Sequence, residues 1–372
     1  IRDSPNGDLR VVGEINNQGT IRVASQGGNS YLRPDGGVAT FTGGGEIHMD
    51  ASAGSTNWMY QISGGSLVNV DNWIHGGGNI GFNNMTIDNQ HEIVADDAAT
   101  SLTIDPGAGG VDNSGTLRAD GGSLVFGSGT FRNANGVIEA LDGSEVVLLS
   151  SSVIEGGTIQ TSGSGQVRAS GLTYLDGSTS GAVTNLGLLR SPVGGDVRGF
   201  GTIDNQGTIR IGSDVGNAYL RPDGDVLMLV GGGEVHMDAS GGSSNWMYQT
   251  GGGWLENIDN TIRGAGNIGF NNMTIVNQAL ITADDASNAL VIDPGAGGLD
   301  NDGTLRAEGG ATLGLNAGDY ENSTGVIRAQ NGSTVQLNTS AVVIGGELIT
   351  AGTGVVRVTS LAYACLLYTS PS

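Results

Sequence analysis

The feature that most constrains the fold is a long internal repeat. The segment 43–52, Gly-Gly-Gly-Glu-Ile-His-Met-Asp-Ala-Ser, returns with one substitution at 231–240, which is 188 residues later. The same offset relates segment 78–87, Gly-Asn-Ile-Gly-Phe-Asn-Asn-Met-Thr-Ile, to segment 266–275. The chain therefore repeats one structural plan, as solenoids and other repeat architectures do.

A shorter motif recurs inside each copy. Its form at 201–210 is Gly-Thr-Ile-Asp-Asn-Gln-Gly-Thr-Ile-Arg, a close match to 13–22, and its core Asn-x-Gly-Thr-Leu-Arg recurs at 113–118 and 301–306. The tetrapeptide Gly-x-[Ile/Leu/Val/Phe]-Arg holds eleven of the fifteen arginines, namely Arg10, Arg22, Arg118, Arg132, Arg168, Arg190, Arg198, Arg210, Arg306, Arg328 and Arg357.

This tetrapeptide predicts a short strand that follows a turn. Side chains alternate sides along a strand, so the apolar third residue is expected to point inward and the arginine outward. We expect the glycine to provide the turn through a positive φ, and the preceding asparagine to tolerate the left-handed region. The irregular spacing of the tetrapeptide predicts that it lies on more than one face.

Glycine spacing indicates the length of one coil. Gly115, Gly136 and Gly157 are 21 residues apart, which is the length of a β-solenoid coil with short strands. Helix is disfavoured, because glycine costs about 1 kcal/mol in a helix interior and no segment has the periodicity of an amphipathic helix. We predict an all-β fold, a parallel β-helix (β-solenoid) with coils of about 20–24 residues and some longer coils. Residues 45–78 are expected to contain an enlarged coil or a protruding loop.

The two copies define the predicted domains. Residues 1–188 are the first β-helix repeat copy, and residues 189–364 are the second, continuous with the first as one solenoid. Residues 365–372, Cys-Leu-Leu-Tyr-Thr-Ser-Pro-Ser, break the pattern and resemble translated sequencing-adapter sequence, so they are predicted to be an artefactual tail. Because Ile1 is not an initiator methionine, we expect the chain to be a fragment of a longer protein.

Composition argues against two kinds of partner. The net charge is −22, and all fifteen basic residues are arginine, so nucleic acid and anionic membrane surfaces are poor partners. No run of eighteen apolar residues occurs, and we expect no membrane insertion of this segment. The single cysteine, Cys365, cannot form an intramolecular disulfide, which fits a secreted repeat protein that is stabilised by stacking.

The Asn-x-Gly-Thr-Ile turns, the Gly-Gly steps at 156–157 and 345–346, and the coil length resemble the β-helical repeat regions of large secreted bacterial proteins. The resemblance is to autotransporter passenger domains and filamentous-haemagglutinin-type adhesins. It covers residues 1 to about 363. It implies a right-handed parallel β-helix that is exported to the bacterial cell surface or the medium, where it presents a binding surface or acts as a stalk.

Aromatic residues of a repeated pentapeptide are the best candidates for binding. Asn-Trp-Met-Tyr-Gln occurs at 57–61 and 245–249, and its rings could stack on sugar faces while the flanking amides bind hydroxyl groups. The candidate glycan-contact residues are Trp58, Tyr60, Trp246 and Tyr248. The alternative is that these rings cap or fill a wide coil. Trp73 and Trp254 have no counterpart in the other copy and are interpreted as local packing.

Two sets of residues are weaker candidates for chemistry. Ala-Asp-Asp-Ala occurs at 95–98 and 283–286, and paired carboxylates serve glycoside hydrolases, but a pair kept in both copies favours a solvated turn. Weak surface calcium binding is the remaining alternative for these carboxylates. His48 and His236 each precede an aspartate by two residues on the same face of a strand. No third ligand recurs in both copies, so we assign no catalytic residue, metal ligand or cofactor.

The sequence thus predicts a non-catalytic extracellular repeat segment of a bacterial surface or secreted protein, acting as an adhesin passenger or structural stalk. The alternatives are a β-helical carbohydrate-active enzyme and a glycan-binding module. The expected partners are glycans or other surface proteins, together with neighbouring coils of the parent protein.

Overall fold

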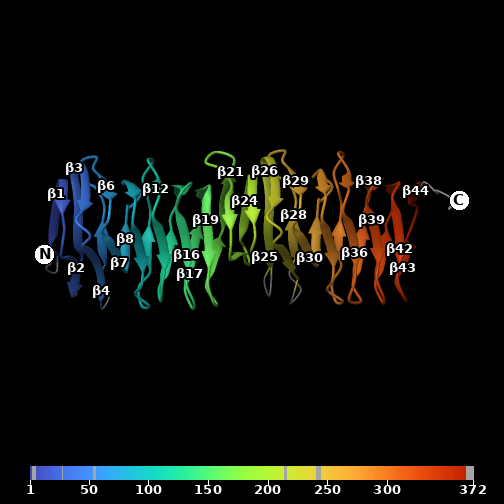
Figure 1. The fold of residues 1–372 in the computed structure, drawn as a ribbon, viewed down its shortest axis with the longest axis horizontal. Coiled ribbons are helices and arrows are strands. Elements are labelled where there is room, and N and C mark those ends of the chain that lie inside the picture. Colours follow the sequence, from blue (N-terminus) through green and yellow to red (C-terminus); the bar gives the residue numbers. More distant parts are fainter. Residues whose placement is uncertain (2–5, 27, 53–55, 213–215, 240–243, 366–372) are drawn as a thin grey trace. The chain divides into compact units, whose positions relative to one another are not determined.

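The strands of this protein pair in parallel with strands of the coils before and after them, which makes each part of the chain a parallel β-solenoid (Figure 1). The computed structural model describes residues 1, 6–26, 28–52, 56–212, 216–239 and 244–365. Those residues contain no helix, so the predicted all-β parallel fold is confirmed. The chain divides into two units, Ile1–Leu189 and Arg190–Ser372. The right-handed sense of the coil and the continuity of the copies stay predictions.

From β4 (Glu46–Ser52) to β19 (Gly157–Thr161), each strand of the first unit pairs with the third strand after it, so a coil there has three strands and the unit has three faces. Face 1 contains β6 (Ser66–Asn69), β9 (Thr86–Asn89), β12 (Val111–Asn113), β15 (Gly129–Arg132), β18 (Ser152–Glu155) and β21 (Leu172–Gly177). Face 2 contains β2 (Thr20–Gln26), β4 (Glu46–Ser52), β7 (Trp73–Gly76), β10 (Glu92–Ala95), β13 (Thr116–Ala119), β16 (Val137–Ala140), β19 (Gly157–Thr161) and β22 (Val183–Asn185). Face 3 contains β5 (Asn57–Met59), β8 (Gly78–Ile80), β11 (Leu102–Ile104), β14 (Ser123–Phe126), β17 (Glu145–Leu149) and β20 (Gln166–Ser170).

The second unit has the same arrangement. Its face 1 contains β29 (Trp254–Asn257), β32 (Ile275–Asn277), β35 (Leu299–Asn301), β38 (Gly318–Glu321), β41 (Ala341–Ile344) and β44 (Tyr363–Cys365). Its face 2 contains β25 (Thr208–Gly212), β27 (Glu234–Asp238), β30 (Thr261–Gly264), β33 (Leu280–Ala283), β36 (Thr304–Ala307), β39 (Val326–Ala329) and β42 (Glu347–Thr350). Its face 3 contains β28 (Ser244–Met247), β31 (Gly266–Ile268), β34 (Leu290–Ile292), β37 (Thr312–Leu315), β40 (Thr334–Leu337) and β43 (Val355–Val358).

Long strands turn a corner and run along two faces. In the first unit these are β1 (Asp8–Asn16) and β3 (Ser30–Thr42), and β3 pairs with β5 on face 3 and with β6 on face 1. In the second unit β24 (Asp196–Asn205) and β26 (Asn217–Val230) do the same. The remaining strand, β23 (Leu188–Ser191), contains the boundary between the units.

Coil lengths agree with the repeat analysis. Thr116 pairs with Val137, 21 residues later, as the glycine spacing predicts. Glu46 pairs with Trp73, 27 residues later, so the interval 45–78 does contain an enlarged coil. Gly-x-apolar-Arg segments occur on all three faces, since Arg118 lies on face 2, Arg132 on face 1 and Arg168 on face 3.

The interior is built from the inward-pointing aliphatic residues of these strands. The apolar residue of the tetrapeptide is buried in nine of its eleven occurrences, as predicted: Ile21, Leu117, Phe131, Val167, Leu189, Val197, Ile209, Leu305 and Ile327. The exceptions are Leu9 and Val356, which are half-buried. Their strands, β1 and β43, each pair with a described strand on one side only. Burial of each aliphatic side chain contributes about 1.5–3 kcal/mol.

Asparagine side chains form a buried ladder at the corner between faces 1 and 2. Asn69 Nδ2 donates to Asn89 Oδ1 at 2.9 Å, and Asn89 Nδ2 donates to Asn113 Oδ1 at 2.8 Å. Asn113 Nδ2 then donates to Asn133 Oδ1 at 2.6 Å. The second unit has the equivalent ladder of Asn257, Asn277, Asn301 and Asn322. The signature asparagine therefore links one coil to the next through its amide group.

The signature glycine has a different role from the one we expected. Gly115 and Gly303 do not have a positive φ, and neither Asn113 nor Asn301 lies in the left-handed region, so the turn explanation is wrong at these positions. A Cβ atom added to Gly115 would overlap the carbonyl oxygen of His91 in the preceding coil. Glycine is needed here because adjacent backbones approach closely.

Of the predicted artefactual tail, Cys365 lies in β44 and is exposed, and 366–372 lie outside the described residues. Within the described part of the chain, no helix is long and apolar enough to span a membrane.

The motif glycine has different surroundings at positions 115 and 19. We therefore predict opposite effects on stability when it is replaced by alanine at the two positions. Gly115→Ala should lower the unfolding free energy by about 1–3 kcal/mol or more, because the new methyl group meets fixed backbone. Gly19→Ala is the matched control, since a Cβ atom there meets open space at a φ that is not positive. It should be neutral or stabilising by up to about 1 kcal/mol. Urea unfolding followed by circular dichroism tests both, and equal effects would contradict this explanation.

The asparagine ladder predicts that removal of one of its amide groups lowers the unfolding free energy. Asn113→Ala leaves the buried Oδ1 atom of Asn133 without its donor, at about 1–3 kcal/mol, and removes one of the three acceptors of Asn89 Nδ2. Ser114→Ala, an exposed neighbour, should change the unfolding free energy by less than about 0.5 kcal/mol. Urea unfolding of the two variants measures the difference. A loss below about 0.5 kcal/mol for Asn113→Ala would mean that the ladder does not stabilise the coils.

Candidate functional site

The predicted aromatic residues of the first unit lie on the outside of face 3, together with two that we did not predict. Asn57 and Met59 of β5 point inward, so Trp58 between them points outward. Tyr31 of β3 pairs with Trp58 in register, which places it in the preceding coil. Phe82, in the turn after β8, completes the group. Parallel register therefore gathers rings from three successive coils.

The rings meet mainly edge to face. The Trp58 and Phe82 centroids are 5.0 Å apart at 86°, and those of Trp58 and Tyr60 are 6.2 Å apart at 86°. Tyr60 also contacts Phe82 at 5.3 Å and Tyr31 at 6.1 Å. Such contacts are favourable for aromatic pairs and hold the rings in a fixed arrangement.

These rings line a small pocket, and the second unit repeats it. The first pocket has a volume of about 180 Å³ and is lined by Asn29, Tyr31, Trp58, Tyr60 and Phe82. The second has a volume of about 190 Å³ and is lined by Asn217, Tyr219, Trp246, Tyr248 and Phe270. Both are smaller than the roughly 300 Å³ at which pockets for drug-sized ligands begin, so each suits one small ring or group.

An arginine packs against one side of each pocket. The Arg33 guanidinium carbon lies 3.8 Å from the Tyr31 ring centroid and 4.6 Å from that of Tyr60. In the second unit, Arg221 lies 3.9 Å from Tyr219 and 4.5 Å from Tyr248. Burial raises the pKa of Tyr248, an effect that Arg221 partly offsets. These cation–π contacts fix the tyrosine rings.

The phenylalanine of each pocket has an unfavourable backbone conformation. Phe82 has φ +53° and Phe270 has φ +51°, in the left-handed region that bulky residues avoid. Each is more than half exposed, at 54% and 55%. The turn begins at Gly81, and a Cβ atom at this position would overlap the carbonyl oxygen of Asp105. Both units thus keep a strained turn that holds an exposed ring beside the tryptophan, and such strain is common at functional sites.

The flanking amides do not lie where we expected. Asn57 and Asn245 are fully buried, so they cannot face a ligand. Gln61 Oε1 accepts hydrogen bonds from the backbone of Gly64 and Gly65, and Gln249 Oε1 accepts one from Gly252. These amides hold turns, and the amides that reach the pockets are instead those of Asn29 and Asn217.

Sequence reasoning missed Tyr31, Phe82 and their counterparts in the second unit. Both segments recur at the offset of 188, in Tyr-Leu-Arg-Pro-Asp-Gly and Gly-Phe-Asn-Asn-Met. Repetition of exposed aromatic residues was the available signal. Their contact with Trp58 depends on strand register, which the sequence does not state.

The aspartate pairs make the contacts of turns and ion pairs. Asp97 Oδ1 accepts hydrogen bonds from the backbone of Ala99 and Thr100, and Asp285 Oδ1 does so from Ser287 and Asn288. Asp96 instead contacts His75 Nδ1 at 2.8 Å. In the second unit Asp284 accepts from Arg263 Nε at 2.8 Å.

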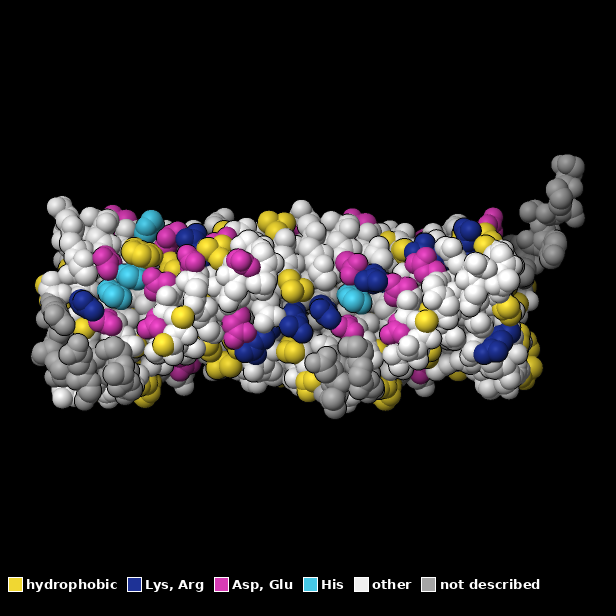
Figure 2. Space-filling view, turned by 90° about the horizontal axis from the view of Figure 1, so that it is seen from below, with side chains coloured by type: hydrophobic (Ala, Val, Ile, Leu, Met, Phe, Trp, Pro, Cys, Tyr) yellow, Lys and Arg dark blue, Asp and Glu magenta, His cyan; other side chains and the backbone are white. Residues whose placement is uncertain are grey.

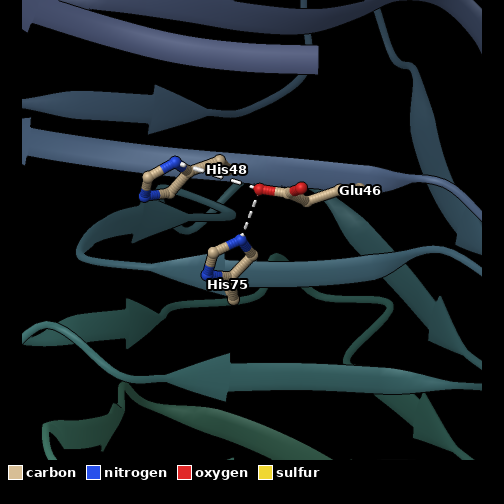
Figure 3. A group of neighbouring side chains, drawn as sticks. All are labelled: Glu46, His48 and His75. Atoms are coloured by element: carbon tan, nitrogen blue, oxygen red, sulfur yellow. Dashed lines mark hydrogen bonds and ion pairs between the residues drawn. The ribbon is translucent and has the colours of Figure 1, made fainter. Parts of the chain in front are cut away.

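Face 2 brings histidines together in the first unit. His48 of β4 pairs with His75 of β7, and their rings stack with centroids 4.5 Å apart. Glu46 Oε1 lies 2.8 Å from His75 Nε2 and 4.0 Å from His48 Nδ1 (Figure 3). Figure 2 shows histidine side chains lying among acidic and arginine side chains on one surface.

The aspartates that follow the repeated histidines are bound to arginines of the same face. Asp50 accepts hydrogen bonds from Arg22, and Asp238 accepts them from Arg210. Trp73 is 39% exposed and its ring stacks on His75 at 3.8 Å, whereas Trp254 Nε1 donates to Glu256 at 2.9 Å. These two tryptophans make local contacts, as their absence from the repeat suggests.

Fold and sites together define a parallel β-solenoid repeat protein whose described residues form a small aromatic pocket in each unit. Comparison with protein-family models, with curated proteins and with solved structures found no match to the chain.

His236 should affect stability in a definite pH range. Burial lowers its pKa from the usual 6.5, and nearby Arg263 lowers it further. The unfolded state therefore binds a proton more readily, so the unfolding free energy should fall as the pH drops below about 6.5. Below the pKa of His236 in the folded state, the titration of this residue should cause no further change in the unfolding free energy.

NMR titration of His236 should give a midpoint below 6.5, and His236→Gln should have a shallower dependence of stability on pH between 7.5 and 5. A midpoint at or above 6.5 would contradict the assigned effect of burial.

Proposed function

We propose that this chain is a non-catalytic repeat segment of a bacterial surface or secreted protein, and that it binds carbohydrate through its two aromatic pockets. The observation that carries the proposal is the duplicated pocket of Tyr, Trp, Tyr and Phe rings. Sugar rings have apolar faces that stack on aromatic side chains, and polar edges that need hydrogen-bonding groups nearby.

The composition of each pocket supports this ligand class. Its walls are aromatic, while Asn29 or Asn217 offers an exposed amide at the edge. A net charge of −22 disfavours polyanions such as nucleic acid, and a neutral sugar meets no such repulsion. The strain at Phe82 and Phe270 supports a role beyond folding, because an exposed ring gains little from burial.

The extracellular assignment rests on other observations. The parallel solenoid agrees with the fold that the resemblance to secreted bacterial adhesins implies, and Cys365 is the only cysteine. Such a segment would present its pockets at the cell surface or in the medium, as an adhesin passenger. A purely structural stalk would share the coil stacking but would have no need of strained, exposed aromatic turns.

Glycan-array screening of the full chain, followed by titration calorimetry with the strongest glycan, tests the proposal. The wild type should bind two ligands per chain, Trp58→Ala or Trp246→Ala one, and the double variant none at concentrations that saturate the wild type. Loss of ring stacking should weaken each pocket roughly tenfold or more. Trp254→Ala, which removes an exposed tryptophan outside the pockets, should bind as the wild type does.

Phe82→Gly separates binding from folding in the same assay. It removes one wall of the first pocket and also the strain of a positive φ, so binding should fall to one ligand per chain. Stability should change by no more than about 1 kcal/mol, because relief of the strain offsets the lost ring contacts with Trp58 and Tyr60. A folded wild type that binds no glycan would contradict the proposal and favour the stalk.

A carbohydrate-active enzyme is the alternative. It is favoured by Asp105 and Asp293, whose pKa is raised by burial, as an acid catalyst requires. Hydrolysis of a bound glycan that disappears in Asp105→Asn, Asp293→Asn double variants would replace the proposed binding role with this one.

A further inference from the structure

Around His75 in the first unit, three side chains that could act as metal ligands lie close together. Glu46 and His48 are two residues apart in β4 and so share its outer side. His75 joins them because β7 pairs with β4 in register. One ligand atom from each of the three residues lies within 4.8 Å of the others (Figure 3).

We propose that Glu46, His48 and His75 bind a divalent transition-metal ion such as Zn²⁺. Two imidazoles and one carboxylate are a common set of protein ligands for zinc, with a fourth position open to water. Imidazole ligands favour zinc, copper and nickel over calcium and magnesium, which prefer oxygen. The site lies on face 2, whereas the aromatic pocket lies on face 3, and neither proposal depends on the other.

The distances require little movement. Tetrahedral zinc with bonds of about 2.0–2.1 Å places neighbouring ligand atoms roughly 3.3 Å apart. Glu46 Oε1 now lies 2.8 Å from His75 Nε2 and 4.0 Å from His48 Nδ1, and all three ligand atoms lie within 4.8 Å of one another, so shifts of up to about 1.5 Å, with rotation of the stacked imidazole rings, bring them into range. Glu46 and His48 are about one-third exposed and have room to rotate.

Groups behind the ligands support the same assignment. Asp96 Oδ2 lies 2.8 Å from His75 Nδ1, the carboxylate contact that metal-binding histidines usually make through the nitrogen that faces away from the ion. On zinc binding, Nδ1 would keep the proton that it shares with Asp96, and Nε2 would give up any proton that it shares with Glu46. Thr20 Oγ1 donates to Glu46 Oε2 at 3.1 Å and leaves Oε1 for the ion.

In the second unit, the residue that corresponds to His75 is the positively charged Arg263. Its Glu234 and His236 keep the same 4.0 Å separation as Glu46 and His48. Arg263 replaces His75, and its guanidinium contacts Asp284 at 2.8 Å and Glu234 at 3.3 Å. A fixed positive charge thus lies between the two carboxylates. In the first unit a bound cation would supply that charge, and arginine cannot act as a ligand.

Exchange of this one residue between the units tests the proposal. Titration calorimetry with ZnCl₂ is carried out on the full chain in a Cys365→Ser background, because the exposed thiol could bind zinc. Millimolar CaCl₂ is present throughout to occupy surface carboxylates. The parent should bind one zinc ion per chain, His75→Arg none, and Arg263→His two.

Circular dichroism must show that each variant is folded. Zinc binding by His75→Arg equal to that of the parent would overturn the proposal, as would a folded Arg263→His variant that gains no second site. Zinc bound equally by all three proteins would mean that the ion binds only to scattered surface groups.

Discussion

The structure depends on hydrogen bonds between asparagine side chains inside stacked parallel coils. Asn89 and Asn113 both donate and accept along the ladder, so Asn89 joins Asn69 before it to Asn113 after it. A buried polar group is costly without partners, and a one-residue slip of register would leave every amide in the row unpaired. The ladder therefore favours one register, and the close backbone approach that admits only glycine at Gly115 belongs to the same corner.

Both surface sites follow from that register. Strands in parallel register place corresponding residues of successive coils side by side on the outside of a face. Face 3 in this way gathers Tyr31, Trp58 and Phe82 into a pocket, and face 2 stacks His48 on His75. The interior tolerates little change, whereas an outward residue can be replaced with little effect on the coil. A solenoid can therefore keep its fold while its surface chemistry varies.

The two units show this separation directly. The pockets keep the same rings, the same arginine contact and the same strained phenylalanine. Face 2 keeps Glu46 and His48 as Glu234 and His236, yet has His75 in one unit and Arg263 in the other. Both His75 and Arg263 contact the carboxylates on either side of them, so the fold of the coil accepts either residue.

The sequence by itself determined the architecture, because the 188-residue offset, the 21-residue glycine spacing and the inward aliphatic positions are all local and periodic. It also pointed to Trp58 and Trp246. Only the tertiary structure decided which residues join them, since Tyr31 and Phe82 come from neighbouring coils and meet Trp58 through register. It also assigned the signature asparagine to a ladder rather than a turn, and brought His75 to Glu46 and His48. These contacts depend on the number of residues in each coil, which varies from coil to coil and is set by packing.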